Sequence, residues 1–194
     1  GQLFAIGPIA FMFLVPAITM QSFSEEYQKR TLEFLMTKPL RDRDIVLGKY
    51  LATVALIFLA LIPTFVYFLS IYSLGSPPGN IDSGAVIGSY IGLFMLGAVY
   101  AAAGTWISSL SPNQIVSFIA SAFACFVLFW AFDFISNLPS IYGKTDSIVK
   151  SLGLQYHYDN ISKGRIDTRD IIYFISWIVL FLWLTMVSLQ KQKL

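Results

Sequence analysis

The run YLATVALIFLALIPTFVYFLSIYSL, residues 50–74, contains no charged side chain. It lies within a longer stretch, residues 50–132, whose only charged residue is Asp82. Two further charge-free runs, residues 1–24 and 171–190, lie near the two ends of the chain. A helix of about 20 apolar residues crosses the hydrocarbon core of a bilayer, and such runs are typical of membrane spans. The sequence therefore predicts a membrane protein.

The overall composition favours the same class. Hydrophobic residues make up 56% of the 194 residues and charged residues 12%, with a mean hydropathy of +0.69. Ordinary globular domains carry about 25% charged residues. The net charge of +2 is too small to indicate nucleic-acid binding, and the single cysteine, Cys125, excludes an intrachain disulfide. We expect an all-α polytopic helical bundle that forms one membrane domain over the whole chain, 1–194.

Five segments are long and apolar enough to be spans: 3–20, 50–74, 85–107, 115–132 and 171–189. The short loop 21–49 holds six Lys and Arg residues, whereas 75–84 holds none. The positive-inside rule then places loop 21–49 and the C-terminus in the cytoplasm. An odd number of spans leaves Gly1 outside with no initiator methionine, so we expect a preceding span and six spans in the intact protein.

The first loop contains a predicted amphipathic helix, SFSEEYQKRTLEFLMT, at residues 22–37. Ser22 would begin it as part of a capping box. Two i,i+4 ion pairs are expected within it, Glu25–Lys29 and Glu26–Arg30. A purely lipid-binding helix would be mainly basic, so charges of both signs favour a protein partner. A linker that only lies on the lipid surface is the more common alternative.

The sequence offers no convincing catalytic or metal-binding motif. The triplet at 143–145, GKT, resembles the end of a P-loop, but Leu138 stands where that motif needs glycine. The pattern Glu25-Glu26-x-x-x-Arg30 matches an intramembrane metalloprotease motif, which also needs histidines in the membrane. The single histidine, His157, is more often a packed, hydrogen-bonded loop residue than a ligand. We expect no catalytic, cofactor-binding or metal-binding residue and a non-catalytic chain.

Small residues recur at helical spacing in two neighbouring spans. Such patterns predict close packing between membrane helices. The residues concerned are Gly88, Gly92, Gly97 and Ala101 in one span and Ser117 and Ser121 in the next. Packing within one subunit and packing across a dimer both remain open, and the first is favoured. The expected spans hold no ionisable residue, which argues against an ion-coupled carrier.

Three pieces of the first loop together resemble the signature cytoplasmic stretch of ABC-2 type permeases, the membrane subunits of certain ATP-binding cassette transporters. They are FSEE at 23–26, TLEFLMTKP at 31–39 and IVLGK at 45–49. The resemblance implies a permease subunit whose loop helix is a coupling helix that docks in a groove of a separate ATPase. The residues implied to contact that ATPase are Glu25, Glu26, Lys29, Arg30, Leu32, Glu33 and Leu35.

The same resemblance implies further partners and local features. ATP and Mg²⁺ would bind to the ATPase, and a second permease subunit would complete a homo- or heterodimer. Residues 133–170 would form short outer helices before the last span. A glycine that is typical of the family near position 30 is absent here, because Lys29 and Arg30 stand in its place. This puts the local bend of the family in question.

Within the family, the chain is most similar to gliding-motility-associated permease subunits of Bacteroidetes. The likeness spans essentially the whole chain and includes PPGNID at 77–82, IGSYIG at 87–92 and YHY at 156–158. It implies an exporter linked to gliding motility in the bacterial cytoplasmic membrane. The alternative is a membrane anchor that transmits ATPase-driven motion to a motility or secretion apparatus without moving a solute.

Overall fold

A computed structural model of the chain describes residues 2–31, 41–74, 83–137, 146–165 and 167–191. Regular structure in these residues is entirely helical, which confirms the expected all-α bundle. The helices are α1 (Gln2–Thr19), α2 (Ser24–Gln28), α4 (Asp42–Leu74), α5 (Ser83–Ser108), α6 (Gln114–Ser136), α7 (Asp146–Ser151), α8 (Leu154–Ser162) and α9 (Thr168–Lys191).

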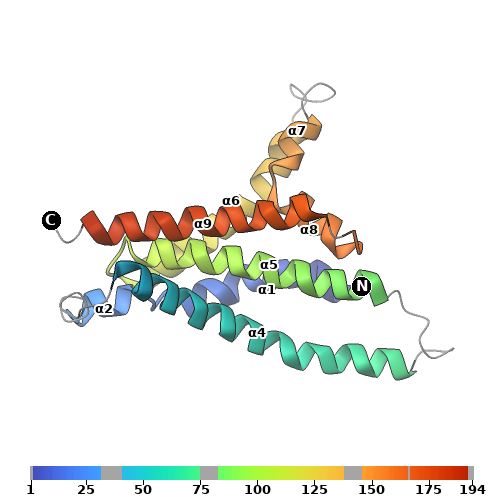
Figure 1. The fold of residues 1–194 in the computed structure, drawn as a ribbon, viewed down its shortest axis with the longest axis horizontal. Coiled ribbons are helices and arrows are strands. Elements are labelled where there is room, and N and C mark those ends of the chain that lie inside the picture. The colour runs from blue at the N-terminus through green and yellow to red at the C-terminus, as the bar shows by residue number, and fades with distance from the viewer. Residues whose placement is uncertain (1, 32–40, 75–82, 138–145, 166, 192–194) are drawn as a thin grey trace.

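Five of the described helices, α1, α4, α5, α6 and α9, are long and apolar enough to cross a membrane. The two ends of the chain lie at opposite ends of the molecule, as an odd number of crossings requires (Figure 1). Helix α4 begins at Asp42, before residue 50 where the expected span starts. Asp42 and Asp44 lie in its first turn. Their negative charges interact favourably with the positive end of the helix dipole and stabilise this start of the helix.

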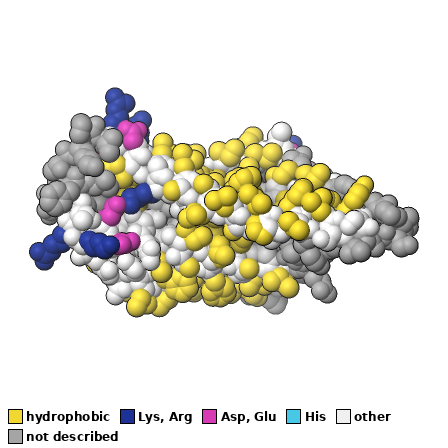
Figure 2. All heavy atoms as spheres, turned by 90° about the horizontal axis from the view of Figure 1, so that it is seen from below, with side chains coloured by type: hydrophobic (Ala, Val, Ile, Leu, Met, Phe, Trp, Pro, Cys, Tyr) yellow, Lys and Arg dark blue, Asp and Glu magenta, His cyan; other side chains and the backbone are white. Residues whose placement is uncertain are grey.

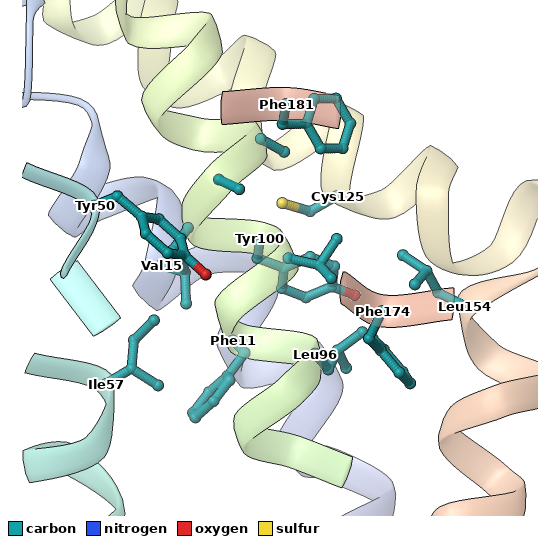
Figure 3. Packing of buried hydrophobic residues seen from close by; sticks show 14 of the residues in the cluster. Phe11, Val15, Tyr50, Ile57, Leu96, Tyr100, Cys125, Leu154, Phe174 and Phe181 are labelled. Atoms are coloured by element: carbon teal, nitrogen blue, oxygen red, sulfur yellow. The ribbon is translucent and has the colours of Figure 1, made fainter. Parts of the chain in front are cut away.

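Helix α5 lies at the centre of the bundle and contacts α1, α4, α6, α8 and α9. Within its most apolar stretch 61% of the residues are buried, against 22% to 33% in the other four long helices. Leu96 and Tyr100 of α5 lie among apolar side chains of its neighbours, including Phe11 of α1, Ile57 of α4 and Phe174 of α9 (Figure 3). The core of the described part of the molecule is therefore built around α5.

Small residues let the neighbouring helices come close to α5. A Cβ atom on Gly88 would lie 2.3 Å from the backbone oxygen of Ile161, so α8 rests directly on this glycine. Gly92 also faces α8, Gly97 faces α1 and α4, and Ala101 is fully buried. The structure thus places these four small residues in contacts within one subunit.

The outer surface has the composition that a membrane span requires. On the face that Figure 2 shows, hydrophobic side chains cover the middle of the molecule, and the visible Lys, Arg, Asp and Glu side chains lie mostly at one end. That end is the one where α2 lies (Figure 1). Between α4 and α5 the apolar surface is hollowed by a groove of about 700 Å³ whose lining includes Phe58, Phe65 and Phe94.

The segment between α6 and α9 contains the two short helices α7 and α8. His157 of α8 joins the two helices that flank it in the chain. Its Nδ1 lies 2.5 Å from Oδ1 of Asp170 and its Nε2 lies 2.8 Å from the carbonyl oxygen of Ser151. Its ring stacks on Tyr173 with 4.0 Å between centroids. The prediction that His157 is packed and hydrogen-bonded is confirmed, although it lies in a helix rather than a loop.

Candidate functional site

The charged end of the molecule is organised around α2, which is much shorter than expected. The predicted helix 22–37 is confirmed at Ser24–Gln28 but is wrong beyond it in the described part, because α2 ends at Gln28 and Arg30 has a φ of 53°. Residues 32–40 lie outside the described residues. The predicted capping box is also wrong: Phe23 is the N-cap residue, and no side chain of the loop caps the helix.

The start of α2 is capped instead by the end of α5. The first N–H groups of a helix lack partners within it. Ser108 Oγ accepts hydrogen bonds from the backbone N–H of Phe23 at 3.0 Å and of Ser24 at 3.2 Å. The Ser24 hydroxyl, fully buried, lies 2.7 Å from Ser117 Oγ and donates to the Ser111 carbonyl at 2.8 Å. One cluster of serines therefore ties α2 to both α5 and α6.

Two further side chains of α2 strengthen this attachment. The Tyr27 hydroxyl donates to the carbonyl of Ser109 at 3.2 Å. Gln28 Oε1 lies 3.5 Å from Nε2 of Gln114, at the start of α6. Ser121, the other predicted packing serine of α6, is fully buried one turn beyond Ser117. One face of α2 is thus held against the bundle, and its charged face points away.

The charges of α2 form two ion pairs of different kinds. The predicted pair within the helix is confirmed: Lys29 Nζ lies 2.5 Å from Glu25 Oε1. The predicted partner of Glu26 is wrong, because its Oε1 lies 2.7 Å from Nζ of Lys49 rather than near Arg30. The reason is that α2 ends at Gln28 and the backbone at Arg30 is left-handed, so Glu26 and Arg30 do not share a helical turn.

Lys49 is a residue of this charged cluster that the sequence analysis did not place beside α2, although it ends the motif at 45–49. It also donates to the carbonyl of Ser22, and its Nζ lies 4.9 Å from the ring centroid of Phe23. Its side chain is 24% exposed, as is that of Glu26, so water only partly screens their attraction. The available signal was a basic residue at a span boundary that follows a loop with acidic residues.

These contacts surround a polar hollow of about 370 Å³ between α1, α2 and α4. Glu25, Glu26 and Lys29, which were predicted to contact a partner, line it together with Lys49. Arg30 is exposed just beyond the end of α2. The other three predicted contact residues, Leu32, Glu33 and Leu35, lie outside the described residues. In the described part of the chain, no group of three or more His, Cys, Asp or Glu side chains could hold a metal.

The strained backbone at Arg30 leads to a prediction about stability. A residue with a Cβ costs about 1–2 kcal/mol in the left-handed region, whereas glycine adopts it freely. We expect Arg30→Gly to be more stable than Arg30→Ala by about 1 kcal/mol, since both variants remove the same charge. The free energy of unfolding of the two variants measures this difference. An alanine variant at least as stable as the glycine variant would contradict it.

Comparison with known families places this arrangement in context. Residues 3–194 match the family described as ABC-2 family transporter protein. The chain belongs to the ABC-2 family. No curated protein sequence matches it. ABC-2 permeases are multi-pass membrane proteins, typically non-catalytic, that work with an ABC ATPase subunit. In this ABC-2 permease, α2 and its charged face follow the first of the long helices, where the sequence resemblance implied a coupling helix.

Proposed function

We propose that this chain is the permease subunit of an ABC-2 exporter and that α2 receives the motion of a separate ATPase. ATP and Mg²⁺ would bind to that ATPase, and a second permease subunit would complete the transporter. The observation that carries the proposal is a short helix with an exposed Glu25–Lys29 ion pair whose other face is bonded to the bundle. A face with both signs of charge suits a protein partner.

The contacts of α2 indicate how a displacement would reach the membrane. The serine cluster joins α2 to the last residue of α5 and to the first turn of α6. The Glu26–Lys49 pair joins it to α4. Packed elements transmit displacement because protein interiors do not deform continuously. A push on α2 would therefore shift the near ends of three long helices together.

Two finer points of the proposal rest on the sequence. The excess of Lys and Arg in loop 21–49 favours a cytoplasmic position for the end of the molecule that carries α2, and for the C-terminus. The motifs at 77–82, 87–92 and 156–158 support an exporter linked to gliding motility in the bacterial cytoplasmic membrane. Both points are proposals about orientation and biological role.

Copurification of the ATPase with the full-length permease tests the coupling surface. Glu26 is unsuited to charge reversal because it holds Lys49, so the test exchanges the exposed pair instead, as Glu25→Lys with Lys29→Glu. This exchange keeps the net charge and the ion pair within α2. The matched control is Arg43→Asp with Asp44→Arg, two exposed neighbours at the same end.

We expect the exchange in α2 to lower recovery of the ATPase about ten-fold, which corresponds to about 1.4 kcal/mol of binding free energy. The Arg43/Asp44 control should recover the ATPase as the wild type does. Mass spectrometry of the purified complexes identifies and quantifies the partner. Equal recovery with both exchanged variants would show that the charged face of α2 does not bind the ATPase.

A further inference from the structure

A third cavity, of about 360 Å³, lies at the end of the bundle opposite α2 (Figure 1). Residues of α1, α5, α6 and α8 line it. Its lining combines aromatic rings with polar groups of α8. The residues that matter below are Phe4, Phe129, Trp130, Gln155, Tyr158 and Asp159. None of them belongs to the coupling surface.

The aromatic part of the lining is an organised cluster. The ring centroids of Phe129 and Trp130 are 5.6 Å apart, and those of Phe129 and Tyr158 are 6.2 Å apart, both edge to face. Tyr158 is positioned further by its hydroxyl, which donates to the carbonyl of Phe4 at 2.7 Å. Ile9, which also lines the cavity, is 40% exposed on the outer face of α1. The cavity is therefore continuous with the apolar surface that faces lipid.

The polar part of the lining contains a carboxylate without a partner. Among the described residues, the side chain of Asp159 makes neither a hydrogen bond nor an ion pair, although it is about half buried. Burial raises the pKa of Asp159, while the charges of Lys163 and Lys150 lower it and that of Asp133 raises it. Lys150 is itself within 3.4 Å of Asp133. A carboxylate withdrawn from water is stabilised by a cation beside it.

A second polar group nearby is also unsatisfied. Gln155 lies one turn before Asp159 on α8, and its Oε1 is buried without a hydrogen-bond partner among the described residues. Buried acceptors in native proteins are nearly always bonded. A donor that reached into this cavity would have two acceptors within one helical turn. Both acceptors and the aromatic cluster line the same space.

These features select the chemistry of the ligand. An organic ammonium group donates hydrogen bonds, supplies the positive charge that would pair with the Asp159 carboxylate, and is attracted to the faces of aromatic rings. A divalent metal would need more ligands than one carboxylate and one amide supply. The link to the lipid-facing surface along Ile9 indicates a ligand with an apolar tail. The exposed cation of Lys163, close enough to affect Asp159, suits a phosphate attached to the ammonium group.

We propose that this cavity binds the ammonium-bearing headgroup of an aminophospholipid, with the ammonium between Asp159, Gln155 and the aromatic rings. The acyl chains would lie along the apolar face of α1. This inference is independent of the proposed coupling to an ATPase. It assigns a lipid site to α8 and to the ends of α1 and α6.

Native mass spectrometry of the full-length permease tests the proposal. Delipidated protein is titrated with phosphatidylethanolamine, phosphatidylglycerol of the same chain length, or soluble phosphoethanolamine. The variant is Asp159→Asn, which keeps the size of the side chain. The matched control is Asp167→Asn, which changes an exposed carboxylate on the same side of the protein. Asp167 caps the start of α9, and asparagine can make the same capping hydrogen bond.

We expect wild type and Asp167→Asn to bind phosphatidylethanolamine about ten-fold more tightly than phosphatidylglycerol, and Asp159→Asn to lose this preference. Equal binding of the two lipids by the wild type would overturn the proposal. So would a preference that survives Asp159→Asn. If soluble phosphoethanolamine bound as tightly as the lipid, the apolar tail would contribute nothing, and the proposal that the ligand is a lipid would be overturned.

A second measurement does not depend on the Asp159 variant. Trp130 lines the cavity, so a brominated phosphatidylethanolamine bound there should quench its fluorescence. The contribution of Trp130 is the difference between wild type and Trp130→Phe in bilayer nanodiscs. We expect brominated phosphatidylethanolamine to quench this contribution more than brominated phosphatidylglycerol does. Equal quenching by the two lipids would contradict the proposed site.

Discussion

Lys49→Met is expected to detach α2 from α4 while leaving α4 in the membrane. The variant removes the 2.7 Å pair with Glu26 and the hydrogen bond to the Ser22 carbonyl. It leaves the Glu26 carboxylate, 24% exposed, without its cation. Loss of a partly buried charged hydrogen bond of this kind costs about 1–3 kcal/mol. We expect the free energy of unfolding to fall by an amount in that range.

The effect on motion should exceed the effect on stability. Spin labels on introduced cysteines at Gln28 and Arg43, both exposed, report the distance between α2 and α4. In the complex with its ATPase, the wild type should keep one narrow distance distribution with and without ATP, because the two helices move together. In Lys49→Met the distribution should broaden when ATP is added. A narrow distribution in the variant would mean that Lys49 does not connect the helices.

Two controls separate the ion pair from a general loss of charge. Arg41→Met removes an exposed cation at the same end and should change neither stability nor the distance distribution. The exchanged pair Glu26→Lys with Lys49→Glu restores opposite charges and should recover about half of the lost stability, since the bond to Ser22 stays broken. A double variant no more stable than either single variant would contradict the pairing.

Gly88→Ala is expected to displace α8 from α5. The added Cβ would lie 2.3 Å from the backbone oxygen of Ile161 and 3.1 Å from Cα of Gly164. Both neighbours are backbone atoms, so a side-chain rotation cannot relieve the overlap. Overpacking of a well-packed contact costs about 1–3 kcal/mol. The free energy of unfolding should fall by about that amount, and trypsin should cleave faster after Lys163 and Arg165.

The matched control for Gly88 is Gly48→Ala on α4. A Cβ on Gly48 meets nothing within 4 Å, so only the helix propensity changes there. Alanine is favoured over glycine inside a helix by about 1 kcal/mol, and Gly48→Ala should therefore be at least as stable as the wild type. The same substitution should thus have opposite effects at the two positions. Destabilisation of similar size at both would show that α8 does not rest on Gly88.

The large features of the fold could be predicted because lipid imposes them locally. Each long apolar run must form a helix, since backbone groups in hydrocarbon have no water to bond with. The five expected spans therefore correspond to α1, α4, α5, α6 and α9. The Glu25–Lys29 pair was also predictable, because both residues belong to one turn of helix.

The details of the charged end were not predictable in the same way. The i,i+4 rule paired Glu26 with Arg30, but the chain turns at Arg30 and the carboxylate meets Lys49 instead. Capping rules selected Ser22, whereas Ser108, far along the chain, accepts the first N–H groups of α2. Local patterns describe only neighbours in sequence, and these partners become neighbours only when α1, α4 and α5 pack together.

The sequence by itself determined that this protein is a multi-span helical membrane protein of the ABC-2 family, because length, apolarity and charge act over short stretches of chain. Only the tertiary structure decided which residues of α2 are anchored and which stay exposed. It also brought the lone carboxylate of Asp159 beside the rings of α6. The physical reason is that desolvation and pairing depend on groups that distant segments supply once the bundle has formed.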